Sequence, residues 1–358
     1  MTKYIIRRLI ASLPVLAGVL VVTFVLARSV PGDPCTAILG EKATQEACER
    51  FRQNKGLDKP IFVQFVLYVK DLARGDFGES IRFKRPVTQI LVERLPTTIE
   101  LGLLGLLIAS IIGIPLGIIS AIRHNSAVDV GTMVGANIGV SMPVFWLGLM
   151  LMYVFALLLK DTPFWLPPSG RLSAGVTPVP FYEFYGLDLG EGALFKLGQF
   201  FAGLYIFNSI ITFDWEVLKD ATRHLILPAL ALATIPMAIT ARMTRSSLLQ
   251  VLGLDYVRTA RSKGLRERRV IIGHAFRNAL LPIITIIGLQ LGILFSGAIL
   301  TETIFSLAGV GSSLREAINA RDYPIIQGFT VVIAVGYIMV NLFVDVSYAF
   351  LDPRIKLD

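Results

Sequence analysis

The stretch LGLLGLLIASIIGIPLGIIS, residues 101–120, contains twenty consecutive residues without a charged side chain. A helix of about 20 apolar residues spans the hydrocarbon core of a bilayer, which is roughly 30 Å thick. The glycines and the proline within the run do not exclude a span, because neighbouring helices can satisfy freed backbone groups in a membrane. We therefore predict a transmembrane helix over residues 99–122.

The composition of the whole chain also indicates a membrane protein. Of its 358 residues, 54% are hydrophobic and 17% charged, and the mean hydropathy is +0.66. Soluble domains carry about 25% charged residues. Two cysteines exclude a Cys-rich zinc module. His124 and His274 are expected inside the cell and His224 outside it, so we predict no metal site.

Five further apolar runs are long enough to be considered as spans. We predict an all-α integral membrane protein with six transmembrane helices, at residues 9–30, 99–122, 132–159, 225–241, 280–300 and 326–350. The first run follows Lys3, Arg7 and Arg8, as in a signal peptide, but no small-residue cleavage site follows it. We expect residues 1–30 to form a retained N-terminal transmembrane helix.

Basic residues near the spans predict the orientation. The segment between spans four and five has nine basic residues against Asp255 and Glu267, a net charge of +7 out of +8 for the chain. The nine are Arg242, Arg245, Arg258, Arg261, Lys263, Arg266, Arg268, Arg269 and Arg277. Residues 161–222 instead carry three basic and seven acidic residues. By the positive-inside rule, both termini and residues 242–279 face the cytoplasm, and residues 31–98 and 161–222 face outward.

Two extracytoplasmic segments are expected. For residues 31–98 we predict a folded cap with helices near 43–53 and 61–74, the second of which ends at Gly75. The alternative is a pair of amphipathic helices lying on the outer leaflet. Cys35 and Cys48 both lie in this cap, where an oxidising environment permits a disulfide; two free thiols are the alternative. Within the outer insertion at 161–222, residues 173–215 are rich in aromatic side chains, and we expect them to form either a docking surface for a partner or an interfacial anchor.

Ionisable residues are scarce inside the predicted spans, with Glu100 at the rim of the second and Asp345 near the inner end of the sixth. Ion-coupled carriers usually place such groups near the bilayer midplane. An ion-coupled secondary transporter or channel is therefore the weaker alternative, and an intramembrane enzyme lacks its catalytic constellation. Glycines four residues apart, such as Gly113 and Gly117, indicate close helix packing.

The cytoplasmic segment at residues 242–279 predicts a short helix, a stop at Gly264 and a second, amphipathic helix. In the second helix the apolar face comprises Val270, Ile271, Ala275, Phe276 and Ala279. A basic amphipathic helix can rest on anionic lipid, bind nucleic acid or satisfy the positive-inside rule. It can also dock in a groove of a cytoplasmic partner.

The sequence YVRTARSKGL at residues 256–265, followed by HAFRNALLP at 274–282, resembles the cytoplasmic signature of binding-protein-dependent ABC importer permeases. That signature has Glu-Ala-Ala followed by Gly. Here Arg258-Thr259-Ala260 and Gly264 occupy those places, as in the dipeptide/oligopeptide/nickel branch. Further motifs resemble the B-type permease of this branch, namely PGDP at 31–34, GLD at 56–58, GDFG at 75–78, RLPTTIEL at 94–101, LPPSGR at 166–171, HLILPA at 224–229, ETIF at 302–305, GVG at 309–311, RDYP at 321–324, NLFVD at 341–345 and LDPR at 351–354. Ala308 departs from the proline usual there.

The resemblance implies a type I ABC importer permease fold in the plasma (inner) membrane of a bacterium or archaeon. It implies one half of a pathway for peptides, with nickel chelates or oligosaccharides as alternatives. The expected partners are a second, C-type permease, two cytoplasmic ATPase subunits, an extracytoplasmic solute-binding protein and membrane lipid, with no nucleic acid. This chain lacks the phosphate-binding loop of ATPases, so ATP and magnesium are expected on the partner subunits, and this chain has no cofactor and no enzymatic activity. The residues expected to couple to the ATPase are Tyr256, Val257, Arg258, Thr259, Ala260, Arg261, Lys263, Gly264 and Leu265.

Overall fold

The computed structural model describes residues 2–29, 35, 44–54 and 56–351. Apart from an isolated antiparallel bridge between Glu79 and Pro86, the regular structure of these residues is helical. The predicted all-α class is confirmed. The PGDP motif, the start of the first cap helix at residue 43 and the last residues of the C-terminus lie outside the described residues.

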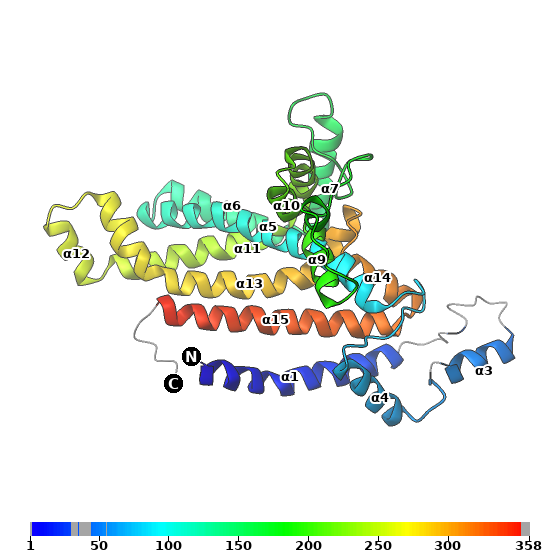
Figure 1. The fold of residues 1–358 in the computed structure, drawn as a ribbon. Coiled ribbons are helices and arrows are strands. Elements are labelled where there is room, and N and C mark those ends of the chain that lie inside the picture. The colour runs from blue at the N-terminus through cyan, green and yellow to red at the C-terminus, as the bar shows by residue number, and fades with distance from the viewer. Residues whose placement is uncertain (1, 30–34, 36–43, 55, 352–358) are drawn as a thin grey trace.

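In the described part of the chain, five long helices form the body of the molecule (Figure 1). They are α1 (Thr2–Ser29), α5 (Val87–Ile122), α11 (Trp215–Leu252), α13 (Arg277–Ile304) and α15 (Tyr323–Leu351). Four of them each contain a stretch long and apolar enough to cross a bilayer, and the fifth such stretch, Arg269–Gly292, begins in the π-helix η2 (Arg269–Phe276) and continues into α13. Two bent helix pairs could raise the number of spans to seven. Spans one, two, four, five and six of the sequence analysis thus fall on single long helices, while the count of six stays a prediction.

The third predicted span is not one continuous helix. Residues 132–159 were expected as a single span, but the structure divides them into α6 (Ala127–Ser141), α7 (Val144–Met152) and the π-helix η1 (Tyr153–Leu158), with a bend of 98° between α6 and the rest. Pro143 explains the break, because proline disfavours helical geometry in the preceding residue. Met142 is accordingly extended, with φ −81° and ψ 128°.

The packing of α11 against α5 forms the centre of the fold. Gly113 and Gly117 of α5 face α11 closely. A Cβ atom added at Gly113 would lie 2.7 Å from the carbonyl oxygen of Met237, and one added at Gly117 would lie 2.5 Å from that of Ala241. Small residues at this spacing allow helix backbones to approach. Leu101, Leu225, Leu227 and Phe305 belong to the buried cluster around this contact.

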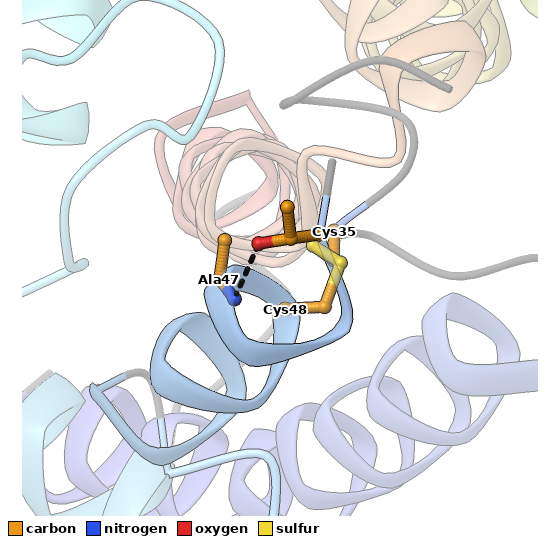
Figure 2. The surroundings of a disulfide bond; sticks show 4 residues. Cys35, Ala47 and Cys48 are labelled. Carbon is orange, nitrogen blue, oxygen red and sulfur yellow. Dashed lines mark hydrogen bonds between the residues drawn. A yellow bond between two sulfur atoms is a disulfide. The ribbon is translucent and has the colours of Figure 1, made fainter. Parts of the chain in front are cut away.

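The cap contains α3 (Gln45–Asn54) and α4 (Ile61–Ala73), and α4 lies beside the end of α1 (Figure 1). Helix α4 ends as predicted, because Gly75 has a positive φ of 79°. Cys35 and Cys48 are joined in a disulfide, with Cα atoms 5.4 Å apart (Figure 2). The Thr44 hydroxyl accepts a hydrogen bond of 3.3 Å from the Ala47 backbone at the start of α3.

The outer insertion contains α8 (Phe181–Phe184), α9 (Ala193–Gly203) and α10 (Tyr205–Ile211), and the last two are bent by 96° relative to each other. Helix α11 begins at Trp215, so its first turns belong to residues assigned to the insertion by sequence. A further short helix, α14 (Val310–Ala320), precedes α15. In Figure 1, α1 begins and α15 ends on the same side of the molecule as α12 (Asp255–Ser262), and α4, α9 and α14 lie toward the other side.

Candidate functional site

The predicted coupling residues lie on a short helix that projects from the end of α11 (Figure 1). Helix α12 (Asp255–Ser262) begins three residues after α11 ends and is followed by Gly264, whose φ is +76°. Only glycine adopts this conformation without strain, so the predicted stop has a clear backbone reason. The chain then returns through the π-helix η2 (Arg269–Phe276) directly into α13.

One face of α12 is buried against the body of the protein. Val257 is fully buried and Ala260 nearly so, and both belong to a cluster with Leu248, Val270 and Ala275. Leu265 packs against the same cluster from beyond the turn. The apolar face predicted for the second helix is therefore the surface on which α12 rests, and its basic residues Arg266, Arg269 and Arg277 are exposed as expected.

The opposite face of α12 is exposed and basic. The predicted coupling residues that are exposed, on α12 or just after its end, are Tyr256, Arg258, Thr259, Arg261, Lys263 and Gly264. The hydroxyl of Tyr256 accepts a hydrogen bond of 2.9 Å from the Asn278 amide, which fixes α12 to α13. Nη1 of Arg258 lies 3.6 Å from Oδ1 of Asp255, and both side chains are largely exposed.

Arg261 pairs with a residue beyond the glycine turn. Its guanidinium donates hydrogen bonds to the Glu267 carboxylate, the shortest being 2.7 Å, and these bonds hold the pKa of Glu267 below its usual value. The pair closes the turn between α12 and η2. The result is a firmly anchored helix that presents cations to the solvent, a surface suited to an acidic groove on a partner protein.

A buried ion pair near this site was not recognised from the sequence. Arg245 of α11 donates two hydrogen bonds of 2.7 Å to the two carboxylate oxygens of Asp129 at the start of α6. Asp129 is buried and also accepts hydrogen bonds from the Ser120 hydroxyl and the Asn125 backbone. From the sequence, Arg245 was only one of nine cytoplasmic cations. The available signal was Asp129 itself, an acidic residue between the second and third predicted spans.

A second unrecognised cluster joins the outer insertion to α5. The Glu100 carboxylate, 7% exposed, accepts hydrogen bonds of 2.7 Å from both the Arg171 guanidinium and the Ile206 backbone. Arg171 also donates to the carbonyl of Gly203 at 2.8 Å and lies over the Tyr205 ring. Glu100 is thus a structural partner of the α9–α10 bend, not a free charge at the rim of a span.

A third buried carboxylate supports the start of α14. Glu302 is fully buried and accepts hydrogen bonds from the Thr98 hydroxyl at 2.6 Å and the Ser312 backbone at 2.8 Å. Gly309 leaves the space that this carboxylate fills. The GVG motif at residues 309–311 is therefore the first turn of a helix resting on Glu302.

Among the described residues, no group of three His, Cys, Asp or Glu side chains is placed to hold a metal ion. His224 is buried, and its Nδ1 lies 2.9 Å from the backbone oxygen of Asp220 in the preceding helical turn. His224 is thus engaged within its own helix.

The sequence matches a transport family along most of its length. The pattern described as "binding-protein-dependent transport system inner membrane component" covers residues 113–357, and its N-terminal companion covers residues 1–102. The chain is 45% identical to the dipeptide transport system permease protein DppB of Alkalihalophilus pseudofirmus, covering 99% of this chain and all of that protein. It is 41% identical to DppB of Escherichia coli K12, and the match covers 99% of each chain. It is 37% identical to the oligopeptide transport system permease protein AppB of Bacillus subtilis, and that match covers 99% of this chain and 100% of AppB.

An all-helical membrane fold and a match over most of the chain define the class of protein. The chain belongs to the inner membrane components of binding-protein-dependent transport systems. It is a multi-pass permease of the plasma membrane, and it works within an importer that also has an ATPase and a solute-binding protein.

Proposed function

We propose that this chain forms half of a transmembrane pathway for peptides and that the exposed face of α12 transmits ATPase movement to it. The peptide substrate is supported by the names of the relatives above, which match from end to end. The observation that carries the coupling role is the construction of α12, with Val257 and Ala260 anchored in the core and Arg258, Arg261 and Lys263 exposed.

The proposed mechanism uses this anchorage. A partner that moves α12 also moves the ends of α11 and α13, because these helices and α12 share one buried cluster. Helix α11 packs along α5, and the Arg245–Asp129 pair joins it to α6. Movement at α12 is therefore transmitted through α11 to α5 and α6. In the proposed complex two ATPase subunits bind ATP and magnesium, and a second, C-type permease completes the pathway.

The test is reconstitution of the complex in proteoliposomes with double substitution of Arg258 and Arg261 by Glu. We expect peptide-stimulated ATPase activity and uptake to fall at least about tenfold, since two cations at a charged interface become anions. Membrane insertion and the amount of folded chain should stay unchanged. Arg123→Glu, which changes an exposed cation in the loop between α5 and α6, is the matched control. Normal stimulation in the double variant would contradict the coupling role.

The substrate is tested separately with the unaltered complex. We expect uptake of labelled di- or oligopeptides that depends on ATP and on the solute-binding protein. Uptake of nickel chelates or oligosaccharides in place of peptides would move the chain to another substrate within the same class. Uptake by the isolated chain driven by an ion gradient without ATP would support the secondary-transporter alternative.

A further inference from the structure

Helix α4 (Ile61–Ala73) is strongly apolar although it lies outside the predicted spans. Ten of its 13 residues are apolar, and its charged residues, Lys70 and Asp71, lie near its C-terminal end. None of its residues is buried within the described part of the chain. The coupling function proposed above does not involve this helix, so its apolar surface needs another explanation.

One face of α4 packs against the outer end of α1. The ring centroids of Phe65 and Tyr68 lie 5.1 and 6.0 Å from that of Phe24, which is only 1% exposed. One turn further along α1, Nε of Arg28 donates a hydrogen bond of 2.9 Å to the side-chain oxygen of Gln64. The α4 residues in these contacts are spaced at i, i+1 and i+4, so they lie on one side of the helix. This side holds α4 against α1.

The other face of α4 is exposed, and its large side chains are apolar. Phe62 is 75% exposed, and Val66, one turn later, is 48% exposed. We call the exposed face of α4 the surface formed by Phe62, Val63, Val66 and Leu67. These positions have the i, i+1, i+4 and i+5 spacing of one helix side, so the apolar surface is continuous. Exposed apolar surfaces of this kind mark contacts with a membrane or with another protein.

The contacts with α1 place α4 at the edge of the bilayer. The stretch of α1 that is apolar enough to cross a membrane runs from Tyr4 to Leu26, so Phe24 lies in its last turn. Figure 1 shows α4 alongside the last turns of α1, whereas α3 lies beyond the end of α1. Exposed apolar side chains of this part of α1, as expected where a span faces lipid, are Val21, Val22, Val25 and Leu26. The exposed face of α4 therefore lies at the level of a surface that the membrane covers.

The two helices of the cap differ in the surface that they expose. Helix α3 has four charged residues among ten, and all of its exposed residues are polar. On α4 the exposed Lys70 has a long apolar stem, which lets its ammonium group reach the headgroup layer from a helix at the membrane surface. The composition thus suits α4 to the bilayer and α3 to water.

From this arrangement we infer that α4 is an interfacial helix whose exposed face is embedded in the outer leaflet of the membrane, while α3 remains in water. The partner of this face is the acyl-chain region of the bilayer. A helix of this kind lies in the plane of the interface, with its apolar side buried about 5–10 Å into the boundary between headgroups and acyl chains. Helix α4 then fastens the cap to the membrane beside α1, and the Cys35–Cys48 disulfide lies in the part of the cap that faces water.

The test is electron paramagnetic resonance of the assembled transporter in lipid nanodiscs, with one nitroxide on a cysteine placed at Val66 and the native disulfide intact. Collision rates are measured with oxygen, which concentrates in hydrocarbon, and with a water-soluble paramagnetic complex. We expect the ratio of the oxygen rate to the aqueous rate to be at least about fivefold higher at position 66 than at Gln53, an exposed residue of α3, because only α4 is embedded.

Two outcomes would overturn the inference. A high aqueous rate at position 66, equal to that at position 53, would place α4 in water. Low rates with both reagents would show that another protein covers the exposed face, in favour of a partner subunit or the solute-binding protein.

A charge substitution gives a second, independent measurement. With the nitroxide at Phe62, Val66→Asp should raise the aqueous collision rate at least about threefold, because a carboxylate withdraws this face from the hydrocarbon. Gln53→Asp adds the same charge to α3 and is the matched control, which should leave the rate at position 62 unchanged. An unchanged rate in Val66→Asp would contradict the embedding of α4, as would an equal increase in both variants.

Discussion

The outer and cytoplasmic ends of this permease are held together by different interactions. At the outer end, buried carboxylates join segments far apart in sequence, as Glu100 does with Arg171 and Asp322 with the Ser80 hydroxyl at 2.5 Å. At the cytoplasmic end, α12 is held mainly by apolar packing of nearby residues, and its charges are exposed. The Arg245–Asp129 pair resembles the outer arrangement there, whereas the Arg8–Asp345 pair between α1 and α15 is more exposed.

This difference has a physical consequence for motion. A buried carboxylate with several fixed donors cannot move without losing all of them, so the outer insertion and α14 are tied to α5. Apolar contacts have no such directional requirement, and an exposed cation can exchange water for a partner at little cost. The outer end is thus constructed as a rigid platform, and α12 as a surface that can engage another protein.

The largest expected effect comes from breaking the outer ion pair. Arg171→Ala leaves Glu100 buried without its cation, which should destabilise the chain by about 3–5 kcal/mol. Denaturant unfolding in detergent micelles measures this change, with Arg258→Ala as the control because Arg258 is 74% exposed in its pair. Similar stability of the two variants would contradict the contrast between the ends.

The second-largest effect on stability is expected from removing the disulfide of the cap. Replacing both Cys35 and Cys48 by Ser removes a link between residues 13 positions apart, which should cost about 2–3 kcal/mol in the free energy of opening the cap. Hydrogen exchange in α3 measures this cost, and exchange in α12 should not change. Ready thiol labelling of both cysteines in the denatured, unreduced wild-type chain would instead show that the bond is absent.

The glycines provide a comparison within the helical body. Gly117→Ala should destabilise by about 1–3 kcal/mol, because the new methyl group meets the backbone of α11. Gly135→Ala should change stability by no more than about 0.5 kcal/mol, since nothing lies within 4 Å of its Cβ position. Thermal unfolding of the isolated chain compares the stability of the two variants. Equal losses of stability in both would show that the α5–α11 contact is looser than described.

The smallest effect on stability is expected for Glu267→Gln. The Arg261–Glu267 pair is about half-exposed and should contribute less than about 1 kcal/mol. Because the folded-state pKa of Glu267 is lowered, this contribution is present above the unfolded-state pKa and is lost as the pH falls through the folded-state pKa. Wild-type and variant should therefore converge in stability at acidic pH, and a gap that widens on acidification would contradict the pairing.

Local patterns in the sequence were sufficient to predict much of this protein. The apolar runs predicted the helical membrane class, and the distribution of cations predicted which segments share a side. Gly75 and Gly264 marked the ends of α4 and α12, because a positive φ is a local property of one residue. The buried face of η2 followed from helical periodicity, with Val270 and Ala275 inside and Arg269 and Arg277 outside.

Other features depended on contacts between distant residues. Pro143 was visible in the sequence, but whether a membrane helix continues past a proline depends on its neighbours, and here it bends by 98°. Arg171 and Glu100 lie 71 positions apart, and no local rule pairs them.

The sequence by itself thus determined the class, the spans as apolar segments and the α12 motif, because each depends on composition or on periodicity over a few turns. Only the tertiary structure decided which charges are buried together and where a membrane helix breaks, because both depend on the elements packed around them.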